Sequence, residues 1–421
     1  MNNDELQVLG AEAIQKRKRW WRKVAMGAVL TVVAVIAIEL SLRWSMFGFG
    51  AIDDHAENST STIVPSLQHA VDSLLNEELE LINGLQGQAI VMEVQTGEIL
   101  AMVGLERNFE GRFQPCKNFA YQQELGSLMK TASLLAVLET GKASLSDVVN
   151  TGGGVWPIDD EQEMTDHNWR RGGYGDITLE QALAVDSNIG IGRTVARVFG
   201  NDQQHFFDLL SKMSFGQPDS IAGVEGLKTT YYSSPQDTDW LSRKIWWSAI
   251  GYGRKIAPVQ MLTFYNAIAN GGKMVKPTLK TGEVEVINPQ IASKANIDSI
   301  QVALEHVVSQ GLGKKAENPF FLVAGIPATS QVCMYGYYND GGVPLNEYQL
   351  AFCGYFPADA PKYSIIVSMN KLGLPASGGG MAGVVFHNIM EWMLYHDMPK
   401  ILVYDEETGD TLKLKETDFT E

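Results

Sequence analysis

Cysteine is scarce in this chain: among 421 residues there are only Cys116, Cys333 and Cys353, an odd number at scattered positions. Such a set argues against a disulfide framework and against a cysteine-based zinc site. The seven histidines have no paired metal-binding spacing, so we expect neither a metal nor a cofactor. Basic residues are also few, with 33 Lys and Arg against 49 Asp and Glu, and the net charge is −16. That balance argues against nucleic acid as a partner.

Basic residues are concentrated near the N-terminus, where residues 16–23 contain six of them around two tryptophans. The apolar run VAMGAVLTVVAVIAIELSL follows at 24–42 and is long enough to span a hydrocarbon core. A signal peptide has a shorter apolar core and a small-residue cleavage site, whereas this run continues into Arg43 and further aromatics. We therefore predict an uncleaved transmembrane helix over 24–43, with residues 1–23 in the cytoplasm. The rest of the chain then lies on the outer side of that membrane.

The remaining chain indicates a linker, one large domain and a tail. Residues 44–64 are polar and rich in turn formers, which is typical of a linker. Helical periodicity then precedes an apolar hairpin pattern around Gly97, and the middle of the chain is mostly helical. Strand patterns return late, at 320–325, 348–356 and 363–370. This order predicts an α+β domain over 65–398, its sheet assembled from both ends of the chain, and a C-terminal tail over 399–421.

The stretch GSLMKTAS at 126–133 places Ser127 three residues before Lys130, at the start of an apolar run. On a helix these positions share a face, so the amine reaches the hydroxyl oxygen. A desolvated lysine can be neutral and take the serine proton, which makes the serine a nucleophile. A Ser-x-x-Lys pattern also arises by chance about once in a chain of this size, so alone it fits two ordinary helix residues equally.

The surroundings of this pair resemble the transpeptidase domain of penicillin-binding proteins, a family in which Ser-x-x-Lys supplies the nucleophile. AIVMEVQTGEILAMVG is similar to the hairpin that opens that domain, and ELGSLMKTASLLAVLETGK resembles its nucleophile helix. Further stretches match in the family's order at 174–191, 250–277 and 353–371, so the resemblance runs from about 65 to 395. It implies the fold of penicillin-binding transpeptidases and serine β-lactamases, an antiparallel sheet flanked by helices.

The resemblance also implies a class B member, anchored in the membrane and related to proteins that crosslink peptidoglycan during septation or elongation. Ser127 would then be the nucleophile and Lys130 its base, with peptidoglycan stem peptides and β-lactams as ligands. Family members usually carry a sizeable pedestal domain between anchor and transpeptidase domain. This chain has only the linker at 44–64 in that place.

The family's second motif, Ser-x-Asn, stands here as Asp186-Ser187-Asn188. Asn188 is kept, but an acid replaces the first serine. An ion pair between Asp186 and Lys130 would keep the lysine protonated and therefore a poor base. Alternatively, the Asp186 carboxylate would itself act as a substitute base.

The third motif is the most altered, because Ile326, Pro327 and Ala328 stand for Lys-Thr-Gly and only the following Thr329 remains. In the family this strand edge binds the substrate backbone by strand addition and its terminal carboxylate through lysine and hydroxyl groups. Isoleucine removes the cation, proline removes a backbone donor, and alanine adds a Cβ where close approach is needed. We expect Thr329 to lie on a sheet strand that faces Ser127.

Two further features carry less specific signals. A literal Lys-Thr-Gly at 280–282 precedes the helical pattern of 297–311 instead of following it, so we predict a hairpin turn there, remote from Ser127. Trp156, Trp169 and Tyr174 lie between the first two motifs and either line the groove or anchor their loop.

Two functions remain open from the sequence. In the first, the protein is a serine D,D-transpeptidase that forms an acyl-enzyme through Ser127. In the second, it is a pseudoenzyme that binds or regulates divisome or elongasome proteins. The second is favoured by the altered third motif, since each lost donor or cation contact is typically worth about 2 to 4 kcal/mol of transition-state stabilisation.

Overall fold

The computed structural model describes residues 61–160, 162–216, 234–237, 244–332 and 347–396, together with the backbone of five more short strands. The transmembrane helix expected at 24–43 lies outside these residues. None of the described helices combines the length and the hydropathy that a membrane span needs.

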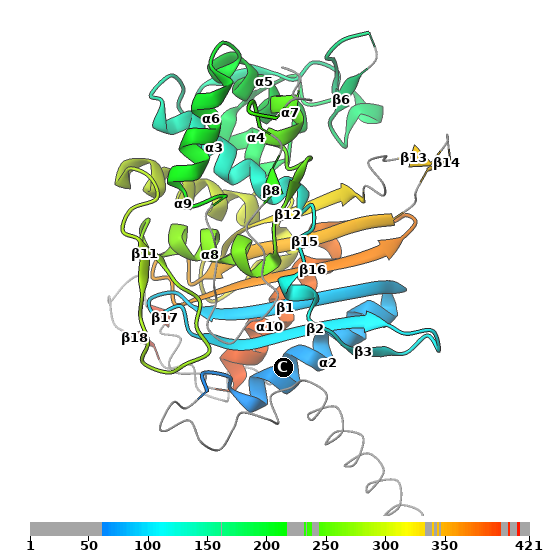
Figure 1. Ribbon diagram of the computed structural model, residues 1–421, viewed down its shortest axis with the longest axis vertical. Coiled ribbons are helices and arrows are strands. Elements are labelled where there is room, and N and C mark those ends of the chain that lie inside the picture. The colour runs from blue at the N-terminus through cyan, green and yellow to red at the C-terminus, as the bar shows by residue number, and fades with distance from the viewer. Residues whose placement is uncertain are drawn as a thin grey trace, which may run out of the picture. The chain divides into compact units, whose positions relative to one another are not determined.

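A six-stranded antiparallel sheet forms the centre of the described structure (Figure 1). The strand order is β12-β15-β16-β1-β2-β3, so β16 from the end of the chain pairs with β1 from its beginning. This pairing confirms a sheet assembled from both ends of the chain. The strands are β1 (Gly84–Glu93), β2 (Ile99–Arg107), β3 (Phe113–Pro115), β12 (Ala324–Gln331), β15 (Glu347–Phe356) and β16 (Tyr363–Leu372).

Two buried cores cover the two faces of this sheet. Helices α2 (Pro65–Leu81) and α10 (Gly383–Tyr395) pack on one face. The other core joins the sheet to the helical part of the chain, which lies above the sheet in Figure 1. Its helices are α3 (Met129–Glu139), α4 (Leu179–Ala184), α5 (Asn188–Phe199), α6 (Gln203–Lys212), α7 (Lys244–Ala249), α8 (Pro258–Ala269) and α9 (Lys294–Ser309).

Local sequence explains these layers. In α2 a proline occupies the first turn, where its missing N–H costs nothing, and buried Leu67, Val71 and Leu75 recur every four residues on one face. In β1, which is buried on both sides, Val91 joins the core under α2 and α10 while Ile90 joins the helical core. The sheet is therefore the partition between the two cores.

Short elements complete the fold. The 3₁₀ and π turns are η2 (Asn118–Ala120), η3 (Gly126–Leu128), η4 (Trp169–Arg171), η5 (Lys314–Ala316) and η6 (Gly378–Ala382). The two-residue and three-residue strands are β4 (Val148–Asn150), β5 (Val155–Pro157), β6 (Glu163–Thr165), β7 (Asp176–Thr178), β8 (Tyr231–Tyr232), β9 (Arg254–Lys255), β10 (Met274–Val275), β11 (Val286–Asn288), β13 (Asn339–Asp340), β14 (Val343–Pro344), β17 (Val403–Tyr404) and β18 (Thr411–Leu412).

One strand expectation is wrong in its position. The apolar run at 320–325 predicts a strand there, but β12 begins only at Ala324 and extends to Gln331. The ladder with β15 starts at the pair Ala324 and Tyr355, and the side chain of Leu322 is 52% exposed outside it. The altered third motif therefore lies within the strand and not after it.

Candidate active site

Ser127 and Lys130 lie where η3 continues into α3. The helix is buried around its whole circumference, since every residue from Met129 to Leu138 is buried. Ser127 is 5% exposed and Lys130 is 0% exposed, so the pair sits at the buried N-terminal end of a central helix. The Tyr265 hydroxyl lies 2.7 Å from the carbonyl oxygen of Leu128 and ties this turn to α8.

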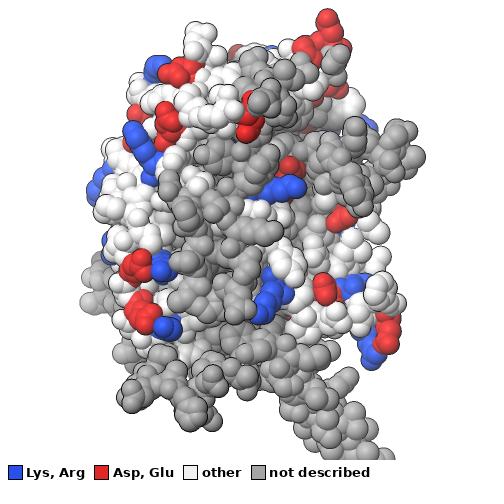
Figure 2. Space-filling model, in the orientation of Figure 1, with Lys and Arg blue, Asp and Glu red and all other residues white. Residues whose placement is uncertain are grey.

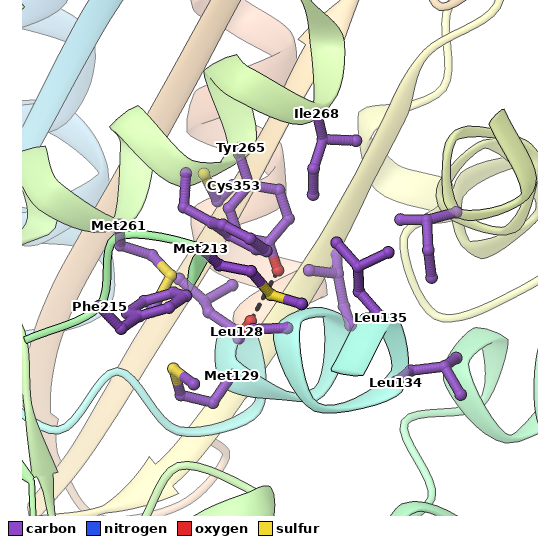
Figure 3. Packing of buried hydrophobic residues seen from close by; sticks show 14 of the residues in the cluster. Leu128, Met129, Leu134, Leu135, Met213, Phe215, Met261, Tyr265, Ile268 and Cys353 are labelled. Atoms are coloured by element: carbon purple, nitrogen blue, oxygen red, sulfur yellow. Dashed lines mark hydrogen bonds between the residues drawn. The ribbon is translucent and has the colours of Figure 1, made fainter. Parts of the chain in front are cut away.

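Packing around this turn is dense. Figure 3 shows side chains of α3 surrounded by others from α8, from β15 and from the end of α6. The labelled members of this cluster are Leu128, Met129, Leu134, Leu135, Met213, Phe215, Met261, Tyr265, Ile268 and Cys353. Because a close-packed core resists displacement, the backbone that carries Ser127 is held in one place.

A carboxylate joins the serine and the lysine. Lys130 Nζ lies 2.5 Å from Asp186 Oδ1 and 2.7 Å from the main-chain oxygen of Asp186. The Ser127 hydroxyl donates to the other carboxylate oxygen, Asp186 Oδ2, at 3.2 Å. Asp186 connects α4 to α5 with φ +54°, in the left-handed region that few non-glycine residues adopt. The three side chains therefore form a serine–carboxylate–ammonium triad, with the ion pair that the sequence suggests.

The backbone before Ser127 requires glycine at two facing positions. Gly126 has φ +54°, and a Cβ there would lie 2.8 Å from the Cβ of Ser330. Gly251 has φ +98°, and a Cβ there would lie 2.1 Å from the carbonyl oxygen of Gly126. Both contacts are shorter than any real Cβ contact, so η3 is clamped between β12 and the segment after α7.

The second motif is held by residues that sequence reasoning missed. Ser187, fully buried, accepts from the Gly190 N–H at 2.9 Å and caps α5. Its hydroxyl donates to Asp166 Oδ2 at 2.8 Å, while Asp166 Oδ1 accepts from the Ile189 N–H at 3.1 Å. Asn188 donates its amide to the carbonyl oxygen of Thr165 at 2.8 Å. No motif signals Asp166; an acid that caps a helix from a distant loop becomes visible only in the fold.

His167, which follows Asp166, lies close enough to the triad to be affected by its charges. His167 and the Tyr174 hydroxyl lie 3.0 Å apart. Desolvation lowers the pKa of His167, against the negative charges of Asp186 and Asp166. Burial raises the pKa of Tyr174 to about 12, and the same two carboxylates add to that rise. Tyr174 therefore belongs to the surroundings of the triad.

The two tryptophans of the same region behave differently. Trp156 is half-buried and packs on Trp246, with ring centroids 5.4 Å apart. Trp169 is 43% exposed and lies under the guanidinium group of Arg170. Trp156 is thus an anchor of its loop, and the structure gives neither tryptophan a contact with Ser127 or Asp186.

The third-motif positions lie on β12, at an edge of the sheet. Ile326 and Ala328 face the helical core, with 0% and 2% exposure. As expected, Thr329 lies on a strand that faces the turn of Ser127, since β12 packs against η3, but its own hydroxyl accepts from the Gly378 N–H at 2.9 Å. Ser330 instead packs against Gly126. Side chains alternate along a strand, so the neighbour of Thr329 occupies the face of the nucleophile.

The backbone of Thr329 nevertheless points to the free edge. The Val332 N–H donates to the Glu347 carbonyl at 3.0 Å, which makes these two residues a hydrogen-bonded pair of the antiparallel ladder. Backbone groups alternate from there, so those of Pro327, Thr329 and Gln331 point away from β15. A proline is tolerated at position 327, because the backbone N–H that it lacks would point to the open edge and not to β15.

Lys280 belongs to a turn, as its context predicts. It lies on the connection between β10 and β11, where Gly282 has φ +80°. Its ammonium group pairs with Glu283 at 3.5 Å, and the Gly282 N–H donates to Glu98 beside the turn between β1 and β2. Its backbone also bridges Ser61, and its ion-pair partner Glu283 lies in the same turn, so it does not replace the cation missing at Ile326.

The described residues contain no group of three or more His, Cys, Asp or Glu side chains that could hold a metal ion. On the face drawn in Figure 2, positive and negative side chains of the described part are interspersed. What the site offers chemically is a serine hydroxyl, a hydrogen-bonded carboxylate and a buried ammonium group, next to an open strand edge.

Comparisons with known proteins agree with this geometry. The family model for the penicillin binding protein transpeptidase domain matches residues 87–391. Penicillin-binding protein PbpB of Mycobacterium tuberculosis is 25% identical over 80% of this chain and 52% of its own length. Peptidoglycan D,D-transpeptidase FtsI of Escherichia coli is 22% identical over 80% of this chain and 56% of its own. The chain thus spans about half the length of these relatives.

The fold is also found in solved structures. The apo transpeptidase domain of penicillin-binding protein 3 from Burkholderia pseudomallei superposes with a TM-score of 0.67. It is 23% identical, and the match covers 80% of this chain and 96% of the domain.

Proposed function

Because the chain belongs to the penicillin-binding protein transpeptidase domain family, with class B relatives, we propose that it is a serine acyltransferase of bacterial peptidoglycan synthesis. Its substrates are stem peptides ending in D-Ala-D-Ala, and β-lactams acylate the same serine. The observation that carries this proposal is the contact of 3.2 Å between the Ser127 hydroxyl and a carboxylate that is itself paired with Lys130.

The geometry supports Asp186 as the proton acceptor. The Ser127 O–H already points at Asp186 Oδ2, whereas the hydrogen bonds described for Lys130 Nζ go to atoms of Asp186. A protonated lysine has no lone pair with which to accept the serine proton. Its positive charge instead stabilises the carboxylate and the charge that develops around it in the low-dielectric interior.

The reaction then proceeds in two balanced halves. As Ser127 Oγ bonds to the penultimate carbonyl carbon, its proton moves to Asp186 and on to the leaving nitrogen of the terminal D-alanine, whose C–N bond breaks. An amine of a neighbouring peptide then attacks the ester. It gives its proton to Asp186, which returns it to Ser127 Oγ as the ester bond breaks.

The strand edge supports binding of an extended donor. The outward backbone N–H of Thr329 lies on the strand that packs against η3, where it can donate to a developing oxyanion or to a peptide carbonyl. Ser127 lies at the N-terminal end of α3, whose dipole also favours negative charge there. Together, the Thr329 N–H and the helix dipole replace part of the transition-state stabilisation that the altered third motif loses with its cation and its backbone donor.

A second candidate is a pseudoenzyme that binds or regulates proteins of the divisome or elongasome. It is favoured by the full burial of Ile326 in the helical core, at the position where the family has a cation, and by Pro327 on the open edge. In that case the fold is retained for binding, and Ser127 does not react.

Placement at the membrane is also a proposal. It rests on the apolar run at 24–42 behind a basic segment. The domain over 65–398 would then act on the outer side of the bacterial inner membrane.

The experiment that tests the acyltransferase is labelling of the full-length protein with a fluorescent penicillin, followed by intact mass. We expect an adduct in the wild type and none in Ser127→Ala. Folded wild-type protein that gains no adduct after long incubation would refute the acyltransferase and favour the pseudoenzyme.

A further inference from the structure

The open edge of β12 is closed at one end by a tyrosine. The backbone groups of Thr329 and Gln331 both point away from β15, and an extended ligand could pair with each of them. At Gln331, however, the backbone N–H already donates to the hydroxyl of Tyr252. Within the described part of this edge, the Gln331 N–H is thus closed to a ligand, whereas the backbone of Thr329 is not taken by Tyr252.

Tyr252 is held on several sides. Its N–H donates to the Trp247 carbonyl at 3.0 Å, and its ring meets the Trp247 ring edge-on with centroids 5.7 Å apart. The glycine before it is locked against Gly126, and the N–H of Gly253 after it donates to Glu124 at 3.0 Å. Tyr252 thus connects the turn of the nucleophile to the strand edge.

The electrostatic surroundings of the phenol agree with a place near the triad. Burial raises the pKa of Tyr252 to about 12, the hydrogen bond from Gln331 opposes this rise, and the charges of Glu124 and Asp186 add to it. The phenol is therefore neutral at physiological pH and remains a stable partner for the Gln331 N–H. It also lies within the field of the carboxylate that contacts Ser127.

The proposed function sets the direction of a bound donor. The scissile carbonyl must reach Ser127, beside Ser330, and the terminal carboxylate lies toward positions 326–328 of the third motif. The part of the donor upstream of the scissile bond then runs toward Gln331 and meets Tyr252.

We propose that Tyr252 is a specificity-determining residue that ends the donor site after one paired residue. This inference rests on the proposed function and extends it. The penultimate residue of the donor pairs with Thr329, and antiparallel register then places the residue two positions upstream opposite Gln331. That residue cannot pair there, because the phenol occupies the Gln331 N–H. Upstream residues leave the strand edge over the tyrosine ring.

Equilibrium binding to the full-length Ser127→Ala protein tests this without any reaction. Two probes are compared by calorimetry, N-acetyl-D-Ala-D-Ala and N-acetyl-L-Ala-D-Ala-D-Ala. The longer probe adds one residue upstream, which places its acetyl carbonyl, two positions before the penultimate residue, opposite the Gln331 N–H. With Tyr252 intact, we expect the two dissociation constants to agree within about twofold. With Tyr252→Ala, the longer peptide should gain about 2- to 13-fold over the shorter one, the range for one additional amide hydrogen bond.

Three further variants complete the experiment. Tyr252→Phe keeps the ring over the edge, so the ratio of the two constants should stay near that of the parent. Tyr252→Leu keeps apolar packing on Trp247 but uncovers Gln331, and it should repeat the gain if the alanine variant does not fold. Tyr395→Ala removes a 53% exposed tyrosine at the end of α10 and should leave the ratio unchanged.

An equal ratio in folded Tyr252→Leu or Tyr252→Ala would overturn the proposal, as would failure of both peptides to bind. Failure of the proposed function has a separate sign, since it appears as wild-type protein that gains no penicillin adduct. A gain for the longer peptide in protein that is never acylated would keep Tyr252 as the end of a peptide-binding edge and leave the fold a binding module.

Discussion

Replacing Asp186 by asparagine separates the two roles that a lysine and a carboxylate could have beside Ser127. Asparagine has nearly the same shape and tolerates the left-handed backbone at φ +54°, so the substitution removes the charge with little change of conformation. If Asp186 accepts the serine proton, acylation by a fluorescent penicillin should slow by about 10²- to 10⁴-fold, the usual contribution of general base catalysis. If Lys130 is the base and Asp186 merely restrains it, the freed amine should make acylation faster.

The same substitution should lower stability. Lys130 is 0% exposed and the Asp186 side chain 17% exposed, so Asp186→Asn leaves a buried ammonium group without its counter-charge. Removing one partner of a buried pair typically costs about 3 to 5 kcal/mol. Because Asp186 is partly exposed, we expect a loss at the lower end of this range, about 3 kcal/mol. Denaturant unfolding of the full-length protein measures this loss, and labelling is carried out where the variant remains folded.

A matched control is Asp298→Asn, which breaks the exposed ion pair with Lys294 on α9. That pair spans four residues of a helix and should contribute only about 0.3 to 0.5 kcal/mol, with no effect on labelling. Unchanged or faster acylation in Asp186→Asn would refute Asp186 as proton acceptor. A stability loss no greater than that of the control would refute the reasoning on the ion pair.

Three further outcomes are expected. Gly251→Ala places a Cβ 2.1 Å from the carbonyl oxygen before the nucleophile, at φ +98°, so it should abolish labelling and cost about 2 to 5 kcal/mol in denaturant unfolding. Gly253→Ala, with φ +69° and no atom near its Cβ, should cost only about 1 to 2 kcal/mol; equal losses would contradict the clamp. The pKa of Glu139 is lowered, because hydrogen bonds from the first turn of α9 outweigh the effect of burial. Its stabilisation is therefore present above the unfolded value near 4.5 and lost as the pH falls through the lower folded value, so Glu139→Gln should cost about 0.5 to 1 kcal/mol at neutral pH and nothing in acid. Burial raises the pKa of Cys353 well above its usual value and that of Cys116 to about 11, so iodoacetamide should modify Cys116 slowly and Cys353 only after unfolding, as peptide mass analysis can verify. Rapid modification of Cys353 in the folded protein would contradict its burial.

The sequence alone identifies those site residues that belong to a local pattern. Ser127 and Lys130 are three positions apart, and helical geometry alone places them on one face. The acid at 186 and the loss of the cation at 326 follow from single positions within recognisable stretches. The turn at Lys280 follows from its place before a helical pattern.

Other features depend on contacts between distant segments. Lys130 and Asp186 are separated by 56 positions, so their distance is a property of how α3 packs beside the α4–α5 connection. Asp166 caps α5 from the loop after β6, and Tyr252 reaches β12 from the segment after α7. No periodicity or motif marks either residue, because their roles exist only after these elements meet.

Sequence by itself determined the apolar periodicity, the α+β order of the elements and the placing of Ser127 and Lys130 on one helix face, since each depends on residues close together in the chain. Tertiary structure alone decided which side of β12 carries each side chain. The phase of a strand is set by its register against its partner, here the pairing of Val332 with Glu347. This register turns the Ser330 side chain toward the turn of Ser127 and the Thr329 backbone groups toward the open edge. A shift of one residue would give each of these two positions the orientation of the other.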